Sequence, residues 1–453
     1  MSLGRLAPMA LIACCLSASP GLAADVTPGH DPWLQKNLAP LLDLYRHLHS
    51  HPELSFREFE TARRIADELK KAGADVTTGV GGLGVVGLLR NGQGPIVLVR
   101  SDLDALPVSE ETSLPYASHV TMKNGSGNVV GVMHACGHDI HMVCLVGTAR
   151  WLAEHRDRWS GTVVLIGQPA EEAGDGAHAM LADGLFTRFP RPNFALALHV
   201  AHDLEAGKVG YCIGPAMASA TSVDLIIKGK GGHGAMPDAT IDPIVLAATL
   251  VLDMQSIVSR EIRPIDPAVL TVGAIHGGSR HNVIPDEVRL QLTLRSFRNE
   301  VRDQMIAGIQ RRAKGLAEAH NAPEPIIEVT DTTPPTVNTP SLVEKVMPTL
   351  VRELSASNIE TVEPTMAAED FGMFGQDGVP TFMFRLGTVP AERIAEALAK
   401  NESLPSLHSS LFQPDPEPTV RTGIRAMSAA VTALLPPARP LPAASARAAS
   451  TGD

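Results

Sequence analysis

Side chains that can bind a metal ion follow directly after several short apolar segments of the chain. They are two carboxylate pairs and one imidazole, namely Asp102 and Asp104, Glu171 and Glu172, and His199. The apolar segments are expected to be buried strands, and open α/β sheets place their sites beyond the carboxyl ends of such strands. We therefore expect these five side chains to meet at one edge of a sheet.

A further group of candidate ligands lies in the segment Cys136–His141, which opens an amphipathic helix expected to run to about residue 155. Thiolate, imidazole and carboxylate groups are the ligands of zinc, manganese and similar divalent ions. Glu171 and Glu172 agree with this, because two adjacent carboxylates at a strand end are costly unless a positive charge lies between them. A metal ion would supply that charge.

Each of these residues also has an ordinary structural interpretation. A lone Cys136 is usually a small buried apolar residue, His199 a hydrogen-bonded core histidine, and the Glu171–Glu172 pair a solvated turn. Their common placement at successive strand ends favours a metal site over separate structural roles.

The segment from about residue 31 to 212 alternates amphipathic helices with short apolar runs, the pattern of a doubly wound α/β sheet. One helical stripe is closed by Gly73 and consists of Phe59, Ala62, Ile65, Ala66 and Leu69. The continuous apolar runs predict strands covered on both faces. The expected strands are 84–89, 96–100, 162–167 and 194–198.

From about residue 214 to 331 the pattern changes to the β-α-β-β-α-β order of a ferredoxin-like unit. The expected elements are a strand at 222–230, a helix at 242–259, strands at 268–276 and 287–297, a helix at 299–319 and a strand at 325–330. Apolar residues at alternating positions from 288 to 294 predict a sheet with one solvated face. We expect residues 214–331 to form an inserted second domain.

The α/β pattern returns after residue 331, with a helix near 342–354, a strand at 381–386 and a helix near 418–435. The first domain is therefore expected to be discontinuous, covering 25–213 and 332–435. The segment 436–453 is rich in Pro, Ala, Ser and Arg, which predicts a disordered tail.

Residues 1–24 predict an export signal, so a periplasmic or secreted location is expected. Arg5 supplies positive charge, residues 6–16 are apolar, and Gly21–Ala23 is a small-residue cleavage site. The alternative is a lipoprotein anchored at Cys14, because Leu11–Cys14 resembles a bacterial lipoprotein cleavage site. No transmembrane segment is expected, since no run reaches about 18 consecutive apolar residues.

Composition restricts the class of protein. The chain has 453 residues, of which 44% are hydrophobic, so two domains are expected. A net charge of −11 leaves no basic field that would gather nucleic acid or anionic lipid. Beyond the signal only Cys136, Cys144 and Cys212 remain, an odd and sparse set that makes no disulfide framework.

Five motifs occur in order along the chain. They are DLDALP from Asp102, HACGHD from His134, PAEE from Pro169, GHGAMP from Gly232 and NVIPD from Asn282. Together they resemble the hippurate hydrolase, aminoacylase and indole-acetyl-amino-acid hydrolase family, which is related to dinuclear carboxypeptidases. The resemblance covers roughly residues 35 to 435.

The resemblance implies two divalent metal ions per subunit, manganese or zinc, with cobalt or nickel as further options. The implied ligands are Cys136, His138, Glu172, His199 and His408. It also implies that Glu171 is the general base, which requires a carboxylate free of the metal. Asp104 would orient a ligand imidazole. Taken alone, His408 would be an ordinary loop residue.

The resemblance further nominates His233, from the inserted domain, as a donor to the tetrahedral oxyanion. In relatives this histidine can come from the other subunit of a dimer, so a homodimer with 214–331 as its dimerisation and lid domain is expected. Asn282 and Arg295 could bind the substrate carboxylate, and Gly387 could line the pocket near His408. The pair Glu369 and Asp370 has a supporting role.

The expected activity is hydrolysis of the amide bond of a small N-acyl amino acid, either hippurate-like or N-acetylated. A metallo-carboxypeptidase or dipeptidase is the first alternative, because the same centre can cleave peptides. A non-catalytic exported binding protein is the second.

Several other candidates are set aside. Packing is the expected role of His141 and Cys144, on the helix after the ligand loop. Loop or surface positions are expected for His178, His202 and His281. A serine hydrolase has little support, because no Gly-x-Ser-x-Gly motif accompanies Ser101 or Ser109.

Overall fold

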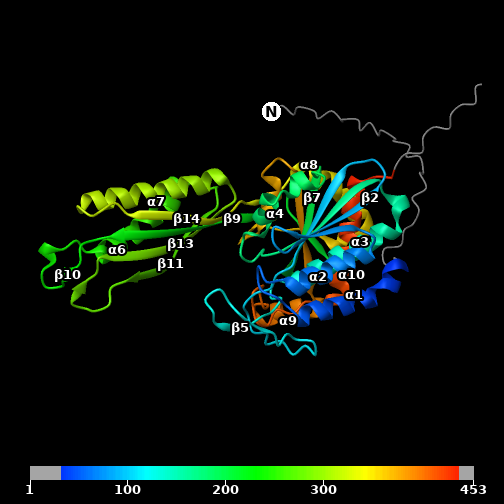
Figure 1. Ribbon diagram of the computed structural model, residues 1–453, viewed down its shortest axis with the longest axis horizontal. Helices are drawn as coiled ribbons and strands as arrows, with labels where there is room; N and C mark the ends of the chain where they lie inside the picture. The colour runs from blue at the N-terminus through cyan, green and yellow to red at the C-terminus, as the bar shows by residue number, and fades with distance from the viewer. Residues whose placement is uncertain (1–31, 438–453) are drawn as a thin grey trace, which may run out of the picture.

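The computed structural model describes residues 32–437, and Figure 1 shows an elongated molecule with a globular body and a second unit extending from it. The predicted export signal, Cys14 and nearly all of the predicted tail lie outside the described residues. The body is built on an eight-stranded mixed sheet. Its strands, in spatial order, are β1 Asp75–Val80, β2 Gly84–Asn91, β6 Gly161–Gln168, β3 Ile96–Asp102, β7 Phe194–Glu205, β18 Thr381–Val389, β8 Val209–Tyr211 and β16 Ile359–Thr361.

The four central strands β6, β3, β7 and β18 run parallel, as expected from their continuous apolar character. Both faces of the sheet are covered. One face packs against α1 (Pro32–Ser50), α2 (Phe59–Lys71), α3 (His138–Glu154), α8 (Pro340–Leu354) and α10 (Pro416–Leu434). The other packs against α4 (Gly176–Ala182), α5 (Leu185–Arg188) and the 3-10 helix η5 (Asp370–Gly375). A mixed α/β fold with a discontinuous body is therefore observed.

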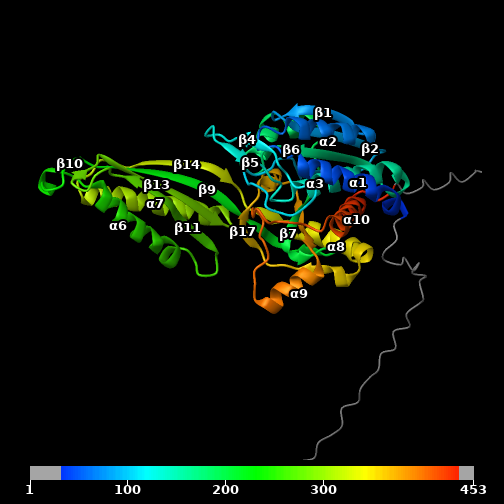
Figure 2. The ribbon, with the colours of Figure 1, turned by 90° about the horizontal axis from the view of Figure 1, so that it is seen from below.

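The second unit is a four-stranded antiparallel sheet in the order β11-β13-β9-β14, with two helices packed on it (Figure 2). Its elements are β9 Gly214–Lys228, α6 Pro243–Ser256, β11 Ala268–Gly277, β13 Glu287–Ser296, α7 Asn299–Ala319 and β14 Ile326–Thr333. This is the predicted β-α-β-β-α-β order. Leu290, Leu292 and Leu294 are buried while Gln291 is exposed, so one sheet face is solvated.

The two units share one strand. The first residues of β9 pair with β15 (Thr336–Asn338) and β17 (Thr365–Ala368) beside the body, whereas its remainder pairs with β13 and β14. The expected boundary at residue 214 is therefore the start of a strand that runs from one unit into the other. Smaller elements are β4 Thr121–Lys123, β5 Val129–Gly131, β10 Gly232–His233, β12 Val283–Ile284 and α9 Ala391–Lys400.

Within residues 32–437, one helical stretch, Pro243–Glu261, is long and apolar enough to cross a membrane. This is weak evidence for insertion, because a helix that packs on its own sheet passes the same test. Leu246 and Leu250 of this stretch are buried against the sheet of the second unit.

Candidate metal centre

The carboxyl ends of the central strands bring the predicted ligands together. β3 ends at Asp102 and β6 at Gln168, so Asp104 and the Glu171–Glu172 pair follow neighbouring parallel strands. His199 lies within β7 rather than at its end, because β7 continues to pair with β18 as far as Glu205. The shared edge of the sheet follows the sequence-based expectation.

Hydrogen bonds assign the tautomers of two histidines at this edge. His138 Nδ1 lies 2.8 Å from the backbone oxygen of Asp104, and His199 Nδ1 lies 2.9 Å from that of Val200. A carbonyl oxygen can only accept, so each Nδ1 carries the hydrogen and each Nε2 presents a lone pair. In the neutral rings both Nε2 atoms are therefore oriented to bind a cation, as metal-binding histidines generally are by such partners.

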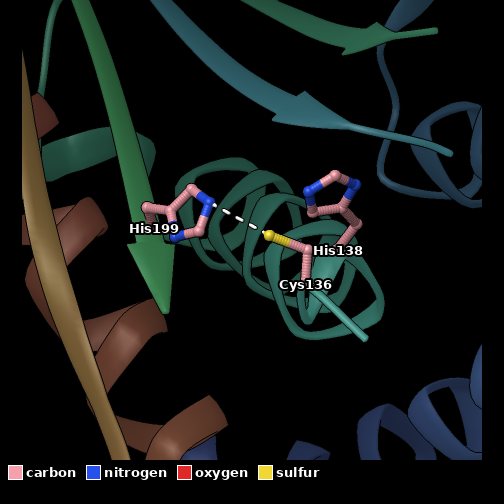
Figure 3. A group of neighbouring side chains, drawn as sticks. All are labelled: Cys136, His138 and His199. Atoms are coloured by element: carbon pink, nitrogen blue, oxygen red, sulfur yellow. Dashed lines mark hydrogen bonds between the residues drawn. The ribbon is translucent and has the colours of Figure 1, made fainter. Parts of the chain in front are cut away.

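These histidines flank Cys136, which stands just before the first turn of α3 (Figure 3). Cys136 Sγ is 3.6 Å from His199 Nε2, and the ligand atoms of Cys136, His138 and His199 all lie within 4.8 Å of one another. Gly137 allows this approach because its φ is +73° and an added Cβ would lie 2.7 Å from Val200. Thiolate and two imidazole nitrogens form a donor set suited to zinc or manganese.

A second group of three potential ligands shares Cys136 and adds Glu172 and His408. His408 Nε2 lies 3.5 Å from Glu172 Oε1. His408 has a left-handed backbone, with φ of 67°, and its N–H donates to the oxygen of Ala135 beside Cys136. This hydrogen bond holds the loop of His408 against the segment that carries Cys136. All five predicted ligands therefore lie close together.

Glu171 lies beside these ligands without a hydrogen bond from any described side chain. Its Oε2 is 3.8 Å from His138 Nε2. Burial, with the charges of Glu369 and Glu172, raises the pKa of Glu171 well above its usual range. Burial likewise raises the pKa of Glu172 to about 7, although His138 opposes the shift. A carboxylate with a raised pKa and no bound partner is suited to accept and release a proton.

Two observations test whether this site fits a metal. His138 Nε2 and Glu172 Oε1 are buried polar atoms without a hydrogen-bond partner among the described residues. Moreover, around the site the described residues hold more buried carboxyl groups than buried guanidinium groups. The carboxyl groups are those of Asp102, Asp104, Glu171, Glu369 and Asp370, against the guanidinium of Arg100. Unpaired buried charges are expensive, so divalent cations fit both the orphaned atoms and the excess negative charge.

Asp104 was expected to orient a ligand imidazole. It holds the His138 ring through its backbone oxygen, whereas its carboxylate Oδ1 is farther away, at 3.4 Å from the same ring nitrogen. Carboxylate Oδ2 instead accepts hydrogen bonds from the Ser55 hydroxyl at 2.6 Å and from the Glu172 N–H at 3.0 Å. Asp104 thus positions two of the candidate ligands.

A cavity of about 510 Å³ opens onto these ligands, between the body and the second unit. Cys136, Glu171, Glu172, His199 and His408 line it, and Arg295 reaches it from β13. Arg295 is half-buried, and desolvation lowers its pKa.

Gly387 is not among the lining residues. An added Cβ there would lie 1.9 Å from the Glu205 oxygen, so this glycine permits close strand packing instead.

His233 and Asn282 lie away from this cavity. Both are exposed at the far tip of the second unit, where β10 and β12 pair and the Gly234 N–H donates to the Asn282 oxygen (Figure 1). Within one chain they do not reach the candidate metal ligands.

Sequence reasoning did not identify two buried residues beneath the site. Arg100 donates to Asp102, Glu369 and Asp370, which fastens the segment after β17 to β3 and gives the Glu369–Asp370 pair its supporting role. His141 was expected only to pack, yet it bonds both Asp102 and the Val200 N–H. Cys144 is buried without such bonds to described residues, as expected, and His178 and His281 are exposed. His202 was expected in a loop or on the surface, but it is half-buried in β7 and lines the cavity. No sequence signal separated His141 from Cys144.

The chain is similar to several known hydrolases. Residues 98–432 match the model of Peptidase family M20/M25/M40. Thermostable carboxypeptidase 1 of Saccharolobus solfataricus is 36% identical over 77% of this chain and 86% of its own. N-acetyl-L-cysteine deacetylase of Bacillus subtilis is 42% identical over 58% and 61%. IAA-amino acid hydrolase ILR1-like 2 of Arabidopsis thaliana is 34% identical over 80% and 81%.

The fold has close solved counterparts. A Bacillus subtilis structure described as a dinuclear metal-binding peptidase of the M20 family superposes with a TM-score of 0.72 and 28% identity, covering 88% of this chain and 99% of that one.

A mixed α/β body with thiolate, imidazole and carboxylate ligands at one sheet edge defines a metal-dependent amidohydrolase or peptidase. The chain belongs to Peptidase family M20/M25/M40. It is an enzyme, so the alternative of a non-catalytic binding protein is dropped.

Proposed function

We propose that this enzyme hydrolyses the amide bond of small N-acyl amino acids, using two divalent ions, zinc or manganese, and Glu171 as general base. The observation that carries the proposal is the placement of Glu171. Its carboxylate lies beside five converging ligands but is free of hydrogen bonds from described side chains. Relatives named as an N-acetyl-L-cysteine deacetylase and an IAA-amino acid hydrolase support an N-acyl amino acid substrate.

Cys136, His138, Glu172, His199 and His408 would hold the ions. When bound, such ions supply a nucleophile at neutral pH and polarise the amide carbonyl. Glu171 takes a proton from the attacking water and later transfers it to the departing amine. Its burial favours proton transfer, because desolvation raises the pKa of Glu171 above its usual range and so makes the carboxylate a stronger base.

Arg295 is proposed to bind the carboxylate of the amino-acid half of the substrate. Its half-buried guanidinium lines the cavity and makes no ion pair with described residues, so its donors are available for a bidentate contact. Asn282 and His233 would join it only if they came from a second subunit.

Because His233 and Asn282 could reach the cavity only from a second subunit, a homodimer is proposed. Residues 214–331 would be its dimerisation and lid domain. β11 is an edge strand, and Val245 and Leu252 on α6 are exposed apolar residues of the same unit. Mixing Glu171→Gln with His233→Ala subunits tests the shared site. Recovery of activity in the mixture supports a dimer that exchanges His233, and a monomeric mass in solution contradicts it.

The main proposal is tested by measuring activity on a panel of N-acetyl and N-benzoyl amino acids. Zinc, manganese and cobalt are supplied separately to metal-stripped enzyme. We expect turnover of at least one N-acyl amino acid with one of these ions. Metal-loaded enzyme that cleaves none of them would contradict it.

A carboxypeptidase or dipeptidase is the second candidate, favoured by the identity with a thermostable carboxypeptidase. The two functions differ in the group attached to the amide. Comparing N-acetylphenylalanine with glycylphenylalanine separates them, because a requirement for the free amino group of the dipeptide would favour the peptidase.

Export to the periplasm or the medium is also proposed, with lipid anchorage at Cys14 as the alternative. Residues 1–24 carry the signal-like pattern. Cell fractionation with the mass of the mature N-terminus tests this. A chain starting near Ala24 supports soluble export, a lipidated cysteine supports the anchor, and an unprocessed cytoplasmic chain contradicts both.

A further inference from the structure

The turn that carries Glu171 and Glu172 has an unusual backbone. Ala170, the residue before them, is fully buried and has a positive φ of 52°. Non-glycine residues rarely adopt this region, because Cβ crowds the backbone there. Such outliers persist only where surrounding contacts enforce them, and they concentrate at functional sites. Some contact must therefore hold Ala170 in place.

The N–H groups of Asp175 and Gly176 donate to the Ala170 oxygen within the turn, and Glu58 supplies a further contact from a distant part of the chain. Its carboxylate Oε1 accepts the N–H of Ala170 at 2.7 Å and the N–H of Phe56 at 3.0 Å. Glu58 is completely buried, and no described cation forms an ion pair with it. Burial, together with the nearby Asp104, raises the pKa of Glu58 to about 7. Burying an acid without a cation is costly unless specific hydrogen bonds compensate for it, and here the Ala170 and Phe56 N–H groups supply them.

Helix capping does not account for Glu58. It occupies the position before α2, but its side chain makes no cap hydrogen bond. The first N–H groups of α2 are satisfied by Glu53, whose carboxylate accepts from Thr61 at 2.8 Å and from Glu60 at 3.3 Å. Glu53 thus accepts hydrogen bonds from the first turn of α2, whereas Glu58 accepts one from the turn at Ala170.

The same segment reaches the turn at a second point. The Ser55 hydroxyl donates to Asp104 Oδ2, which also accepts the N–H of Glu172. Segment 53–58 therefore fixes the N–H groups of the two residues that flank Glu171, that of Ala170 directly through Glu58 and that of Glu172 indirectly through Ser55. Glu58, Ser55 and Asp104 themselves do not line the cavity.

We propose that Glu58 is a positioning residue that holds the Ala170 turn and thereby aims Glu171 and Glu172 at the metal centre. The inference rests on the proposed roles of Glu171 as base and Glu172 as ligand. It adds a residue that acts through the backbone and contacts neither metal nor substrate.

The test compares Glu58→Ala with the matched control Glu53→Ala, because both remove a carboxylate that accepts backbone N–H groups. We expect Glu58→Ala to lower kcat and zinc affinity by about 10- to 100-fold each, the range for residues that orient ligands, with little change in KM. Glu58→Gln, which keeps the accepting oxygen, is expected to stay near wild type. Glu53→Ala is expected to lose stability while keeping kcat and zinc affinity.

If Glu58→Ala does not fold, Glu58→Asp replaces it, since its shorter side chain cannot reach Ala170. Adding Ala170→Gly to the defective variant should restore part of kcat, because glycine adopts positive φ without a Cβ. A residue that merely stabilised α2 would not respond to that change. Kinetics and zinc affinity equal to those of Glu53→Ala would overturn the proposal.

Zinc affinity, measured by competition with a chelator, needs no substrate. A wild-type enzyme that binds zinc but cleaves no N-acyl amino acid would refute the proposed function and leave the Glu58 comparison intact. Conversely, an active wild type with an unaffected Glu58→Ala variant would refute only the role of Glu58.

Discussion

His141 Nδ1 donates a hydrogen bond to Asp102 Oδ1 across 2.7 Å, in a fully buried layer under the candidate metal centre. The donor is assigned because His141 Nε2 accepts the N–H of Val200 at 2.9 Å. Val200 directly follows His199, so this imidazole connects the end of β3 to the part of β7 that carries a candidate ligand.

We expect His141→Ala to leave the Val200 N–H buried and unpaired. The loss should be about 1–3 kcal/mol of stability, together with weaker zinc binding. Urea unfolding and chelator competition measure the two effects. Cys144→Ala, in the same helix, is the control and should leave zinc binding unchanged. Equal zinc affinities for the two variants would show that His141 does not support the metal site.

Glu171→Gln is expected to bind metal as the wild type does and to lose about 10²- to 10⁴-fold in kcat, the usual contribution of a general base. Neutral glutamine keeps the shape of the side chain but cannot take a proton. Metal analysis and kinetics on one preparation check both parts. Loss of metal in this variant would mean that Glu171 is a ligand.

Removal of the metal is expected to destabilise the protein, because the buried carboxyl groups that Arg100 does not pair would then lack a neutralising cation. An ion bound only by the folded state adds about 2.7 kcal/mol when its concentration is 100 times its Kd. Thermal unfolding with increasing zinc should show a rising midpoint. The rise should be smaller in Glu172→Ala, and an equal rise in both proteins would place zinc elsewhere.

His49 should make stability depend on pH. Burial lowers its pKa, but hydrogen bonds to Asp139 at 2.7 Å and Glu110 at 3.2 Å outweigh that effect and raise it to about 9. The folded state therefore holds this proton more tightly than the unfolded state, whose pKa is near 6.5. The stabilisation is complete below pH 6.5 and is lost as pH rises to 9.

The pKa difference corresponds to about 3 kcal/mol at most. Urea unfolding at pH 6.5 and at pH 9 should show this decline in the wild type and a weaker one in His49→Gln. The exposed His178→Gln serves as control and should behave like the wild type. A decline of the same size in His49→Gln would assign the pH dependence to other groups.

Arg295→Gln is expected to raise KM by about 10- to 100-fold for an N-acyl amino acid, since a hydrogen bond to a charged group contributes about 1.5–3 kcal/mol. The matching substrate with its carboxylate converted to an amide should be affected much less. An equal loss on both substrates would show that Arg295 supports the domain and does not bind the carboxylate.

Element positions were predicted closely where the sequence is strongly apolar. The helix expected to open at Cys136–His141 and to run to about residue 155 is α3, His138–Glu154, although it is buried on nearly all sides and is not amphipathic as predicted. The strand expected at 96–100 is β3, Ile96–Asp102. Phe59 was assigned to the apolar stripe of α2 but is 62% exposed, whereas Ala62, Ile65, Ala66 and Leu69 of that stripe are buried. β7 extends past its apolar run, since pairing with β18 compensates for polar residues there.

The sequence by itself determined the donor types and their attachment to successive strand ends, because residue chemistry and apolar periodicity are local properties. Only the tertiary structure decided which nitrogen of His138 and His199 is free, that Asp104 orients His138 through its carbonyl, and that Glu58 holds Ala170. These depend on contacts across long sequence separations, 112 residues for Glu58 and Ala170. Chain topology creates such contacts, and no local pattern encodes them.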